Sequence, residues 1–152
     1  MQNKCCIDSC VWVKYAGHFK VATLLQLIRK NNLVVYADNY LLGEIHNALI
    51  EGFCFKPADA DKLIQFISPF LIIKAPRNIF RLSKDAKDNF LYDLCIQNNC
   101  RYLITIDKEI LKDANAPFLR KTDAWLKKMA FLILSRFCHA FFLLFILFLN
   151  VT

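Results

Sequence analysis

Glycine and proline are scarce in this chain, which has three Gly and four Pro among 152 residues. So little of either excludes collagen-like chains and disordered chains rich in these residues. The glycines stand apart at positions 17, 43 and 52, so the chain has no glycine-rich loop to bind phosphate groups. The sequence therefore argues against nucleotide-dependent kinases and dehydrogenases.

The sequence also lacks the short-range histidine and cysteine pairs that mark many metal sites. The three His are isolated, and the seven Cys include no C-x-x-C pair. Because zinc sites usually use such short spacings, the pattern disfavours a zinc site. Residues 1–4 are polar and the first apolar run is short, so we expect no secretory signal. We expect reduced cysteines in a cytoplasmic protein.

Charged and apolar residues are unevenly distributed along the chain. All thirteen acidic residues, and all but one of the twenty Lys and Arg, lie in residues 1–128. Residues 129–149 contain eighteen apolar residues out of twenty-one. We therefore predict a soluble domain over residues 1–128, followed by a hydrophobic C-terminal tail over residues 129–152. The net charge of +7 suits a polyanionic partner and solubility equally well.

The tail is long enough to cross a membrane as a helix. A helix over residues 129–149 rises about 32 Å, close to the thickness of the hydrocarbon layer. Basic residues before it would hold its start in the cytoplasm. Membrane association is therefore one interpretation of residues 129–149. The others are a helix packed on the domain or on a partner, and an appended reading frame.

Short apolar runs alternate with amphipathic helical patterns in residues 1–128. Because these runs are continuous, we expect strands covered on both faces, as in a parallel sheet. The predicted fold class is α/β, a three-layer α/β/α sandwich around a parallel sheet of four to five strands, with a hydrophobic C-terminal helix. The predicted strands are 5–7, 33–36, 70–73 and 102–105. The predicted helices are 19–30, 39–51, one after Pro57, 89–97 and one after Asp107, and residues 117–128 would supply a last short strand and helix.

Four acidic residues stand where such a fold places its ligands, beyond the carboxyl ends of the strands. Asp8 and Asp107 each follow a predicted strand. Asp88 begins a predicted helix, and Glu44 borders the apolar stripe of the 39–51 helix. Asp88 and Asp107 also suit helix N-caps, and Glu44 suits an ordinary boundary position. Asp8 is harder to explain in this way, because an unpaired buried charge is costly.

Carboxylates from separate segments have a joint use in binding Mg²⁺ or Mn²⁺, hard cations that take oxygen ligands. A pair of such ions activates water and stabilises the leaving oxygen of a phosphodiester. The ions also relieve the repulsion among clustered carboxylates, which otherwise raises their pKa values. The spacing along the chain does not show whether the four acids converge.

Five segments carry a resemblance to a known family. Residues 6–12, which contain Ile-Asp-Ser-Cys-Val, resemble an opening strand with the pattern Asp-Thr/Ser-Asn-Val. The other four segments are Tyr-Leu-Leu-Gly-Glu-Ile (40–45), Lys-Asp-Ala-Lys-Asp-Asn-Phe-Leu (84–91), Tyr-Leu-Ile-Thr-Ile-Asp-Lys-Glu-Ile-Leu (102–111) and Lys-Thr-Asp-Ala-Trp-Leu (121–126). In order and content these segments resemble the PIN domain, especially the bacterial PIN-family toxins of toxin–antitoxin pairs. The likeness covers roughly residues 4–128.

The resemblance implies a Mg²⁺- or Mn²⁺-dependent endoribonuclease that cleaves single-stranded RNA, as the toxin of a type II toxin–antitoxin pair. It implies a protein antitoxin as partner and leaves homodimerisation open. The catalytic residues and metal ligands that it implies are Asp8, Glu44, Asp88 and Asp107. The supporting residues that it implies are Thr105, Asp85 and Ser9.

A basic, proline-broken loop over residues 74–87 leads to Asp88. Basic side chains in this loop would hold the phosphates of RNA, namely Lys84, Lys87 and Arg81. The alternative is a merely solvated loop.

Two residues depart from the family pattern. Cys10 stands where the family usually has Asn, so a polar group that would orient Asp8 is missing. Ile106 replaces a small residue and would crowd the mouth of the site. An alternative function follows, a catalytically impaired PIN-like module that binds RNA or protein. A phospho-receiver domain is a third hypothesis, although the paired acids of that class near the first strand are lacking.

Overall fold

The computed structural model describes residues 3–77 and 86–112. The strand and helix predicted within residues 117–128, the hydrophobic tail, and residues 78–85 of the basic loop lie outside the described residues. Among the helices that are described, none is long and apolar enough to cross a membrane.

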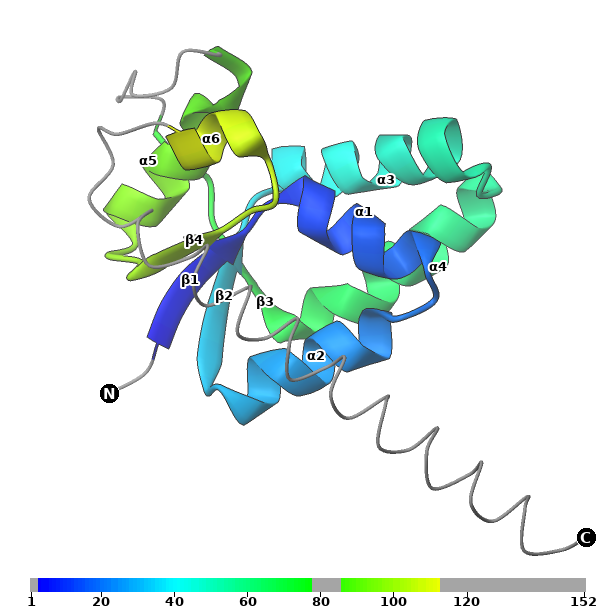
Figure 1. Ribbon diagram of the computed structural model, residues 1–152, viewed down its shortest axis with the longest axis horizontal. Helices are drawn as coiled ribbons and strands as arrows, with labels where there is room; N and C mark the ends of the chain where they lie inside the picture. The colour runs from blue at the N-terminus through cyan, green and yellow to red at the C-terminus, as the bar shows by residue number, and fades with distance from the viewer. Residues whose placement is uncertain (1–2, 78–85, 113–152) are drawn as a thin grey trace, which may run out of the picture.

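A four-stranded parallel sheet forms the centre of the described part (Figure 1). Its strands lie in the order β3-β2-β1-β4, so the first strand of the chain is a central one. This arrangement confirms the predicted α/β fold with a parallel sheet flanked by helices. The strands are β1 (Asn3–Ile7), β2 (Leu33–Ala37), β3 (Leu71–Ile73) and β4 (Tyr102–Ile104).

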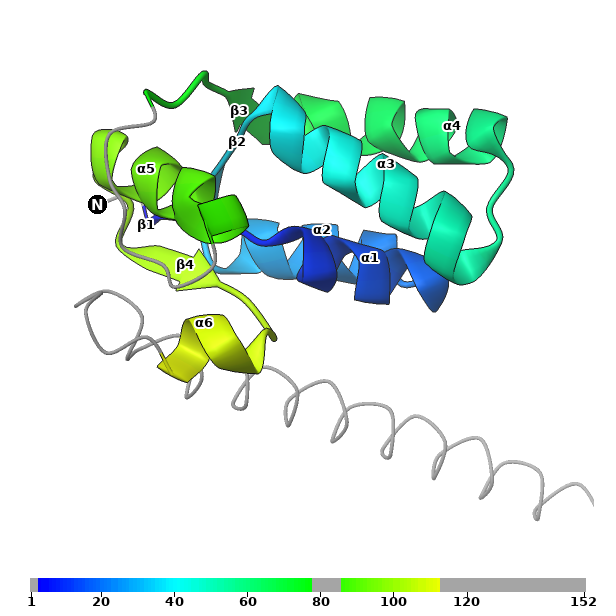
Figure 2. The same cartoon turned by 90° about the horizontal axis from the view of Figure 1, so that it is seen from above.

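Helices cover both faces of the sheet. Helix α5 lies on one side, whereas α1 to α4 lie on the other, as the two views in Figures 1 and 2 show. The helices are α1 (Ser9–Gly17), α2 (Val21–Lys30), α3 (Asn39–Phe53), α4 (Pro57–Ile67), α5 (Asn89–Gln97) and α6 (Lys108–Lys112). Two 3₁₀ turns, Ser68–Phe70 and Ala86–Asp88, precede β3 and α5.

The apolar stripe predicted for the 39–51 helix is confirmed in α3. Leu41, Ile45 and Leu49 lie one helical turn apart and are completely buried. Glu44 is half-buried beside this stripe, at the border where its position on the helix predicts it. This placement turns Glu44 toward the rest of the protein rather than toward open solvent.

Helix α1 is the element that the sequence pattern did not predict. It begins directly after Asp8, whose backbone is extended and whose carbonyl oxygen accepts from the amides of Val11 and Trp12. The Trp12 indole Nε1 donates to the carbonyl oxygen of Ile7 at 3.2 Å, and Val11 and Trp12 are both buried. Valine and tryptophan favour strands, so tertiary packing overrides local preference here. The turn from strand to helix places Asp8 at the carboxyl edge of the sheet.

Candidate active site

The strand order predicts where a ligand would bind. The chain passes from β1 to β2 to β3 in one direction and then returns to β4 on the other side of β1. In open parallel sheets, ligands bind beyond the carboxyl ends of the strands at the point where this direction reverses. That point lies between β1 and β4. Asp8 follows β1 and Thr105 follows β4, so both stand at it.

Asp8 is a buried carboxylate with three side-chain donors. Only 5% of its surface is exposed. Its Oδ1 accepts from Ser9 Oγ at 3.2 Å, and its Oδ2 accepts from Cys10 Sγ at 2.9 Å and from Thr105 Oγ1 at 2.5 Å. All three donors are neutral, so they fix the orientation of the carboxylate without cancelling its charge.

The Cys10 thiol supplies a hydrogen bond to Asp8 where the family usually has the side chain of Asn. Burial, followed by the negative charge of Asp8, raises the pKa of Cys10 to about 12. The thiol therefore stays protonated at neutral pH and donates to Asp8. The expectation that Cys10 leaves Asp8 without a donor is wrong, because sulfur supplies that donor. Ile106 is 40% exposed at the same edge of the sheet.

Thr105 connects Asp8 to Asp107. The Thr105 side chain is completely buried, and its Oγ1 donates to Asp8 while accepting from the Asp107 amide at 2.9 Å. Asp107 itself is exposed, and its Oδ1 accepts from the Glu109 amide at 2.7 Å. Asp107 thus caps α6, the simpler of the two predicted roles, and its backbone is held close to Asp8.

Glu44 lies within the electrostatic reach of other acids. Burial raises its pKa, and the nearby Ser9 hydroxyl, which Glu44 shares with Asp8, opposes this shift. The negative charges of Asp8, Asp88 and Asp38 raise the pKa further. The structure therefore brings Asp8, Glu44 and Asp88 into one acidic region, although they lie far apart in the sequence.

Asp88 stands at the N-cap position of α5 and is half-buried, but its side chain makes no capping hydrogen bond. The Asp88 carboxylate therefore does not cap α5, which was one of the two predicted roles of this residue. Lys87, which precedes it, is exposed. Three other predicted site residues, Arg81, Lys84 and Asp85, lie outside the described residues.

Asp38 belongs to the same region and was not predicted. It follows β2 directly and is only 5% exposed. Its Oδ1 accepts from the Leu41 amide at 2.8 Å and so caps α3, and burial raises its pKa. The signal was present in the sequence, because Asp38 follows an apolar strand just as Asp8 does.

Two observations bear on whether these acids fit a divalent cation. Neither Asp8 nor Glu44 forms an ion pair with any described residue, and their oxygens are the ligand type that Mg²⁺ and Mn²⁺ prefer. The acids are nevertheless loosely arranged. Across the two described ranges, no three of them have carboxylate oxygens all within 4.8 Å of one another. The donor chemistry fits a hard cation, whereas the spacing of the described acids does not by itself form a three-ligand site.

Comparison with protein families identifies the chain's fold family. The sequence profile described as PIN domain matches residues 4–109, which is more than half of the chain and includes all four predicted acids. No curated protein matches the chain.

Proposed function

The chain belongs to the PIN domain family, and from this premise we propose that it is a divalent-metal-dependent endoribonuclease that cleaves single-stranded RNA. PIN domains are generally metal-dependent nucleases and typically use divalent metals. The observation that carries the proposal is the buried Asp8 carboxylate, held by neutral donors at the switch point of the sheet, together with Glu44, whose pKa the charges of Asp8 and Asp88 raise.

In this proposal the side chains that would hold Mg²⁺ or Mn²⁺ are Asp8, Glu44, Asp88 and Asp107. The bound metal supplies an activated water and neutralises charge during phosphodiester hydrolysis. The protein's own contribution is to orient these ligands. Ser9, Cys10 and Thr105 aim the Asp8 carboxylate, and such outer partners strongly influence metal affinity. Asp85 would be a further outer partner.

The basic loop would bind the phosphates of the substrate. Lys87 is exposed next to Asp88, and Lys84 and Arg81 precede it in the sequence. Lysine and arginine contacts to phosphate are independent of base sequence and weaken as salt rises. We therefore propose that this loop holds the backbone of single-stranded RNA beside the acids.

The wider setting is also a proposal. The likeness of the sequence to PIN-family toxins supports a toxin that a protein antitoxin neutralises. In this proposal residues 1–128 form the nuclease domain, which acts in the cytoplasm, and a homodimer is an open alternative. The hydrophobic composition of residues 129–149 supports membrane association through the tail. Recovery of the full chain from the membrane fraction of cells, and its release when residues 129–152 are deleted, would test the role of the tail.

Cleavage of an unstructured RNA with Mn²⁺ tests the nuclease proposal. The Asp8→Asn variant keeps the size of the side chain but removes its charge, so we expect at least about a 100-fold loss of cleavage rate. Asp59→Asn is a matched control, because Asp59 is an exposed acid on α4 whose partner is Lys62. We expect the control to cleave like the wild type. Equal cleavage by wild type and Asp8→Asn would contradict the proposal.

The second candidate is a PIN-like module that binds RNA or protein without cleaving it. The loose spacing of the acids favours it, because no three of those described come together at one point. In this case wild type and Asp8→Asn would bind the RNA with equal affinity, and neither would cleave it with Mn²⁺ present.

A further inference from the structure

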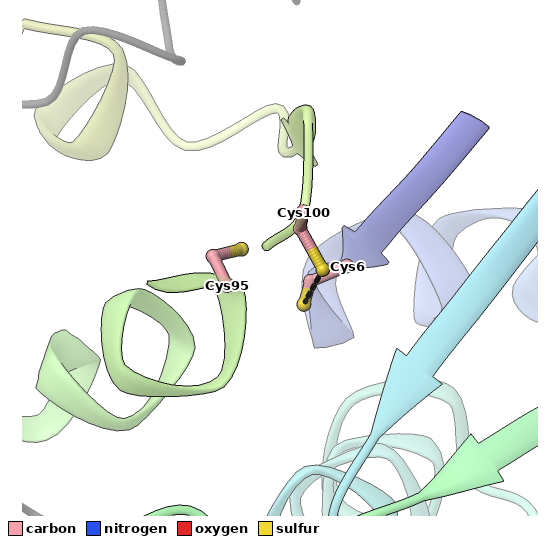
Figure 3. Close-up of side chains that lie close together, drawn as sticks. All are labelled: Cys6, Cys95 and Cys100. Carbon is pink, nitrogen blue, oxygen red and sulfur yellow. Dashed lines mark hydrogen bonds between the residues drawn. The ribbon is translucent and has the colours of Figure 1, made fainter. Parts of the chain in front are cut away.

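Three cysteines meet on the α5 side of the sheet (Figure 3). Cys6 comes from β1, Cys95 from α5, and Cys100 from the turn between α5 and β4. Their sulfur atoms all lie within 4.8 Å of one another, and the sulfurs of Cys6 and Cys100 are 3.7 Å apart. All three side chains are buried.

The turn after α5 brings two of these cysteines together. Asn99 adopts a left-handed conformation with φ of 52°, which reverses the chain at the end of the helix. The Cys100 amide then donates to the Cys95 carbonyl oxygen at 2.8 Å. Four residues separate the two cysteines, a spacing within the range that zinc sites use. Parallel pairing of β1 with β4 brings Cys6 to the same place.

Buried cysteines often serve only as small apolar residues, but two features distinguish this cluster. First, its sulfurs come from segments about ninety positions apart and still converge on one point. Second, a cation lies nearby. Lys4 Nζ donates to the carbonyl oxygen of Asn98, in the turn, at 3.3 Å. Hydrogen bonds from Cys6 and Cys95 lower the pKa of Cys100, and the charge of Lys4 lowers it further. Lys4 therefore partly balances a negative charge on the Cys100 sulfur.

We propose that Cys6, Cys95 and Cys100 bind one soft metal ion of the class of Zn²⁺ or Cu⁺. Thiolate sulfur is the ligand that these ions prefer. Sulfurs bound at about 2.3 Å to one ion lie about 3.8 Å apart when the angle is tetrahedral, close to the 3.7 Å between Cys6 and Cys100. Each thiol that becomes a ligand forms a bond from sulfur to metal and releases its proton to solvent.

The thiolate site is distinct from the acidic region. Cys100 precedes β4 and Thr105 follows it, so the two sites are separated along that strand, while on β1 Cys6 lies two residues before Asp8. A metal held by the three cysteines would tie together β1, α5 and the start of β4. Its role would be structural, and the proposal does not depend on nuclease activity.

Metal binding by the reduced, metal-free full chain tests the proposal. Zn²⁺ alone, and Cu⁺ alone without oxygen, would each be titrated against a coloured chelator. We expect wild type to bind one equivalent of at least one ion, and Cys95→Ser and Cys100→Ser to bind it at least about tenfold more weakly. Cys54→Ser is the control, because Cys54 is exposed at the end of α3, and its affinity should equal that of wild type.

Because a buried serine can unfold the chain, a second measurement uses the wild type alone. X-ray absorption of the loaded chain counts the sulfur ligands, and we expect three. Failure to bind either ion, a spectrum of oxygen ligands only, or undiminished binding in a folded Cys95→Ser variant would overturn the proposal. RNA cleavage is not the readout, so the outcome is separate from that of the nuclease proposal.

Discussion

The side chains around Asp8 illustrate how neutral groups prepare an anion for a cation. Removing a carboxylate from water is costly unless charge and hydrogen bonds compensate. Asp8 has the hydrogen bonds, from Ser9, Cys10 and Thr105, but no partner of opposite charge within the described part of the chain.

Thr105→Val tests the bridge between Asp8 and Asp107. Valine has nearly the shape of threonine but no hydroxyl, so the Asp107 amide and the Asp8 carboxylate each lose a partner. We expect about 1–3 kcal/mol lower stability and a roughly 10- to 100-fold lower Mn²⁺-dependent cleavage rate. Urea unfolding and the RNA assay measure the two effects. Thr105→Ser restores the hydroxyl and should recover most of the activity, and a Val variant as active as wild type would exclude a positioning role.

Asp38 predicts a pH dependence of stability. Burial raises its pKa in the folded protein, so the unfolded chain loses this proton first as pH rises. As pH rises past the usual pKa of a carboxyl group, the contribution of Asp38 to the free energy of unfolding therefore falls. The fall is complete once the pH is above the pKa of Asp38 in the folded protein. Asp38→Asn keeps a good N-cap but does not titrate. Its stability relative to wild type should be greater at pH 7 than at pH 3 in urea unfolding with EDTA, and a difference that is the same at both pH values would contradict this.

Among the elements, those with a distinct apolar stripe were predicted most closely. Helix α5 has the predicted bounds of residues 89–97, and α3 buries the predicted stripe. Strand β3 begins at Leu71 rather than Phe70, because Phe70 ends a 3₁₀ turn that contains a proline. Helix α1 was missed because its buried Val11 and Trp12 favour strands. Local pattern identifies an element best when one of its faces is polar.

Gly43→Ala should stabilise α3. Glycine within a helix is less favourable than alanine by about 0.5–1 kcal/mol, and a methyl group at Gly43 would meet no atom within 4 Å apart from its chain neighbours and the local backbone of α3. Urea unfolding should show a gain of about this size. Gly17→Ala is the contrasting variant, because its methyl group would come within 2.1 Å of the Phe53 ring, and it should gain less or lose stability. Equal gains at both positions would contradict the close approach of Phe53, at the end of α3, to Gly17, at the end of α1.

At the scale of the whole molecule, Asp8 and Asp38 reach one acidic region because parallel strands end at one edge, and α3 and the start of α5 add Glu44 and Asp88. The strand-end rule predicted Asp8 and Asp107 from the sequence, and the same rule applied to β2 would have found Asp38. No such rule could find the three cysteines. Their meeting requires both the left-handed turn at Asn99 and the pairing of β1 with β4, and neither is visible as a spacing motif.

Metal should stabilise the whole fold if the acids bind it. A ligand that binds only the folded state, at about 100 times its dissociation constant, adds about 2.7 kcal/mol. We expect Mn²⁺ to raise the thermal midpoint of wild type, and EDTA to reverse this shift. Asp8→Asn should respond much less, and Asp59→Asn should respond as wild type does. Equal shifts in Asp8→Asn and wild type would place the bound ion elsewhere.

The hydrogen bond from Thr105 to Asp8 joins positions 97 apart in the sequence. Contacts this distant form only after the intervening chain exists, and during synthesis the N-terminal part emerges first. A nascent chain that has exposed β1 to β3 therefore carries Asp8 and Glu44 without the strand that completes their edge. If the protein cleaves RNA, its site is therefore complete only after β4 has emerged and paired with β1.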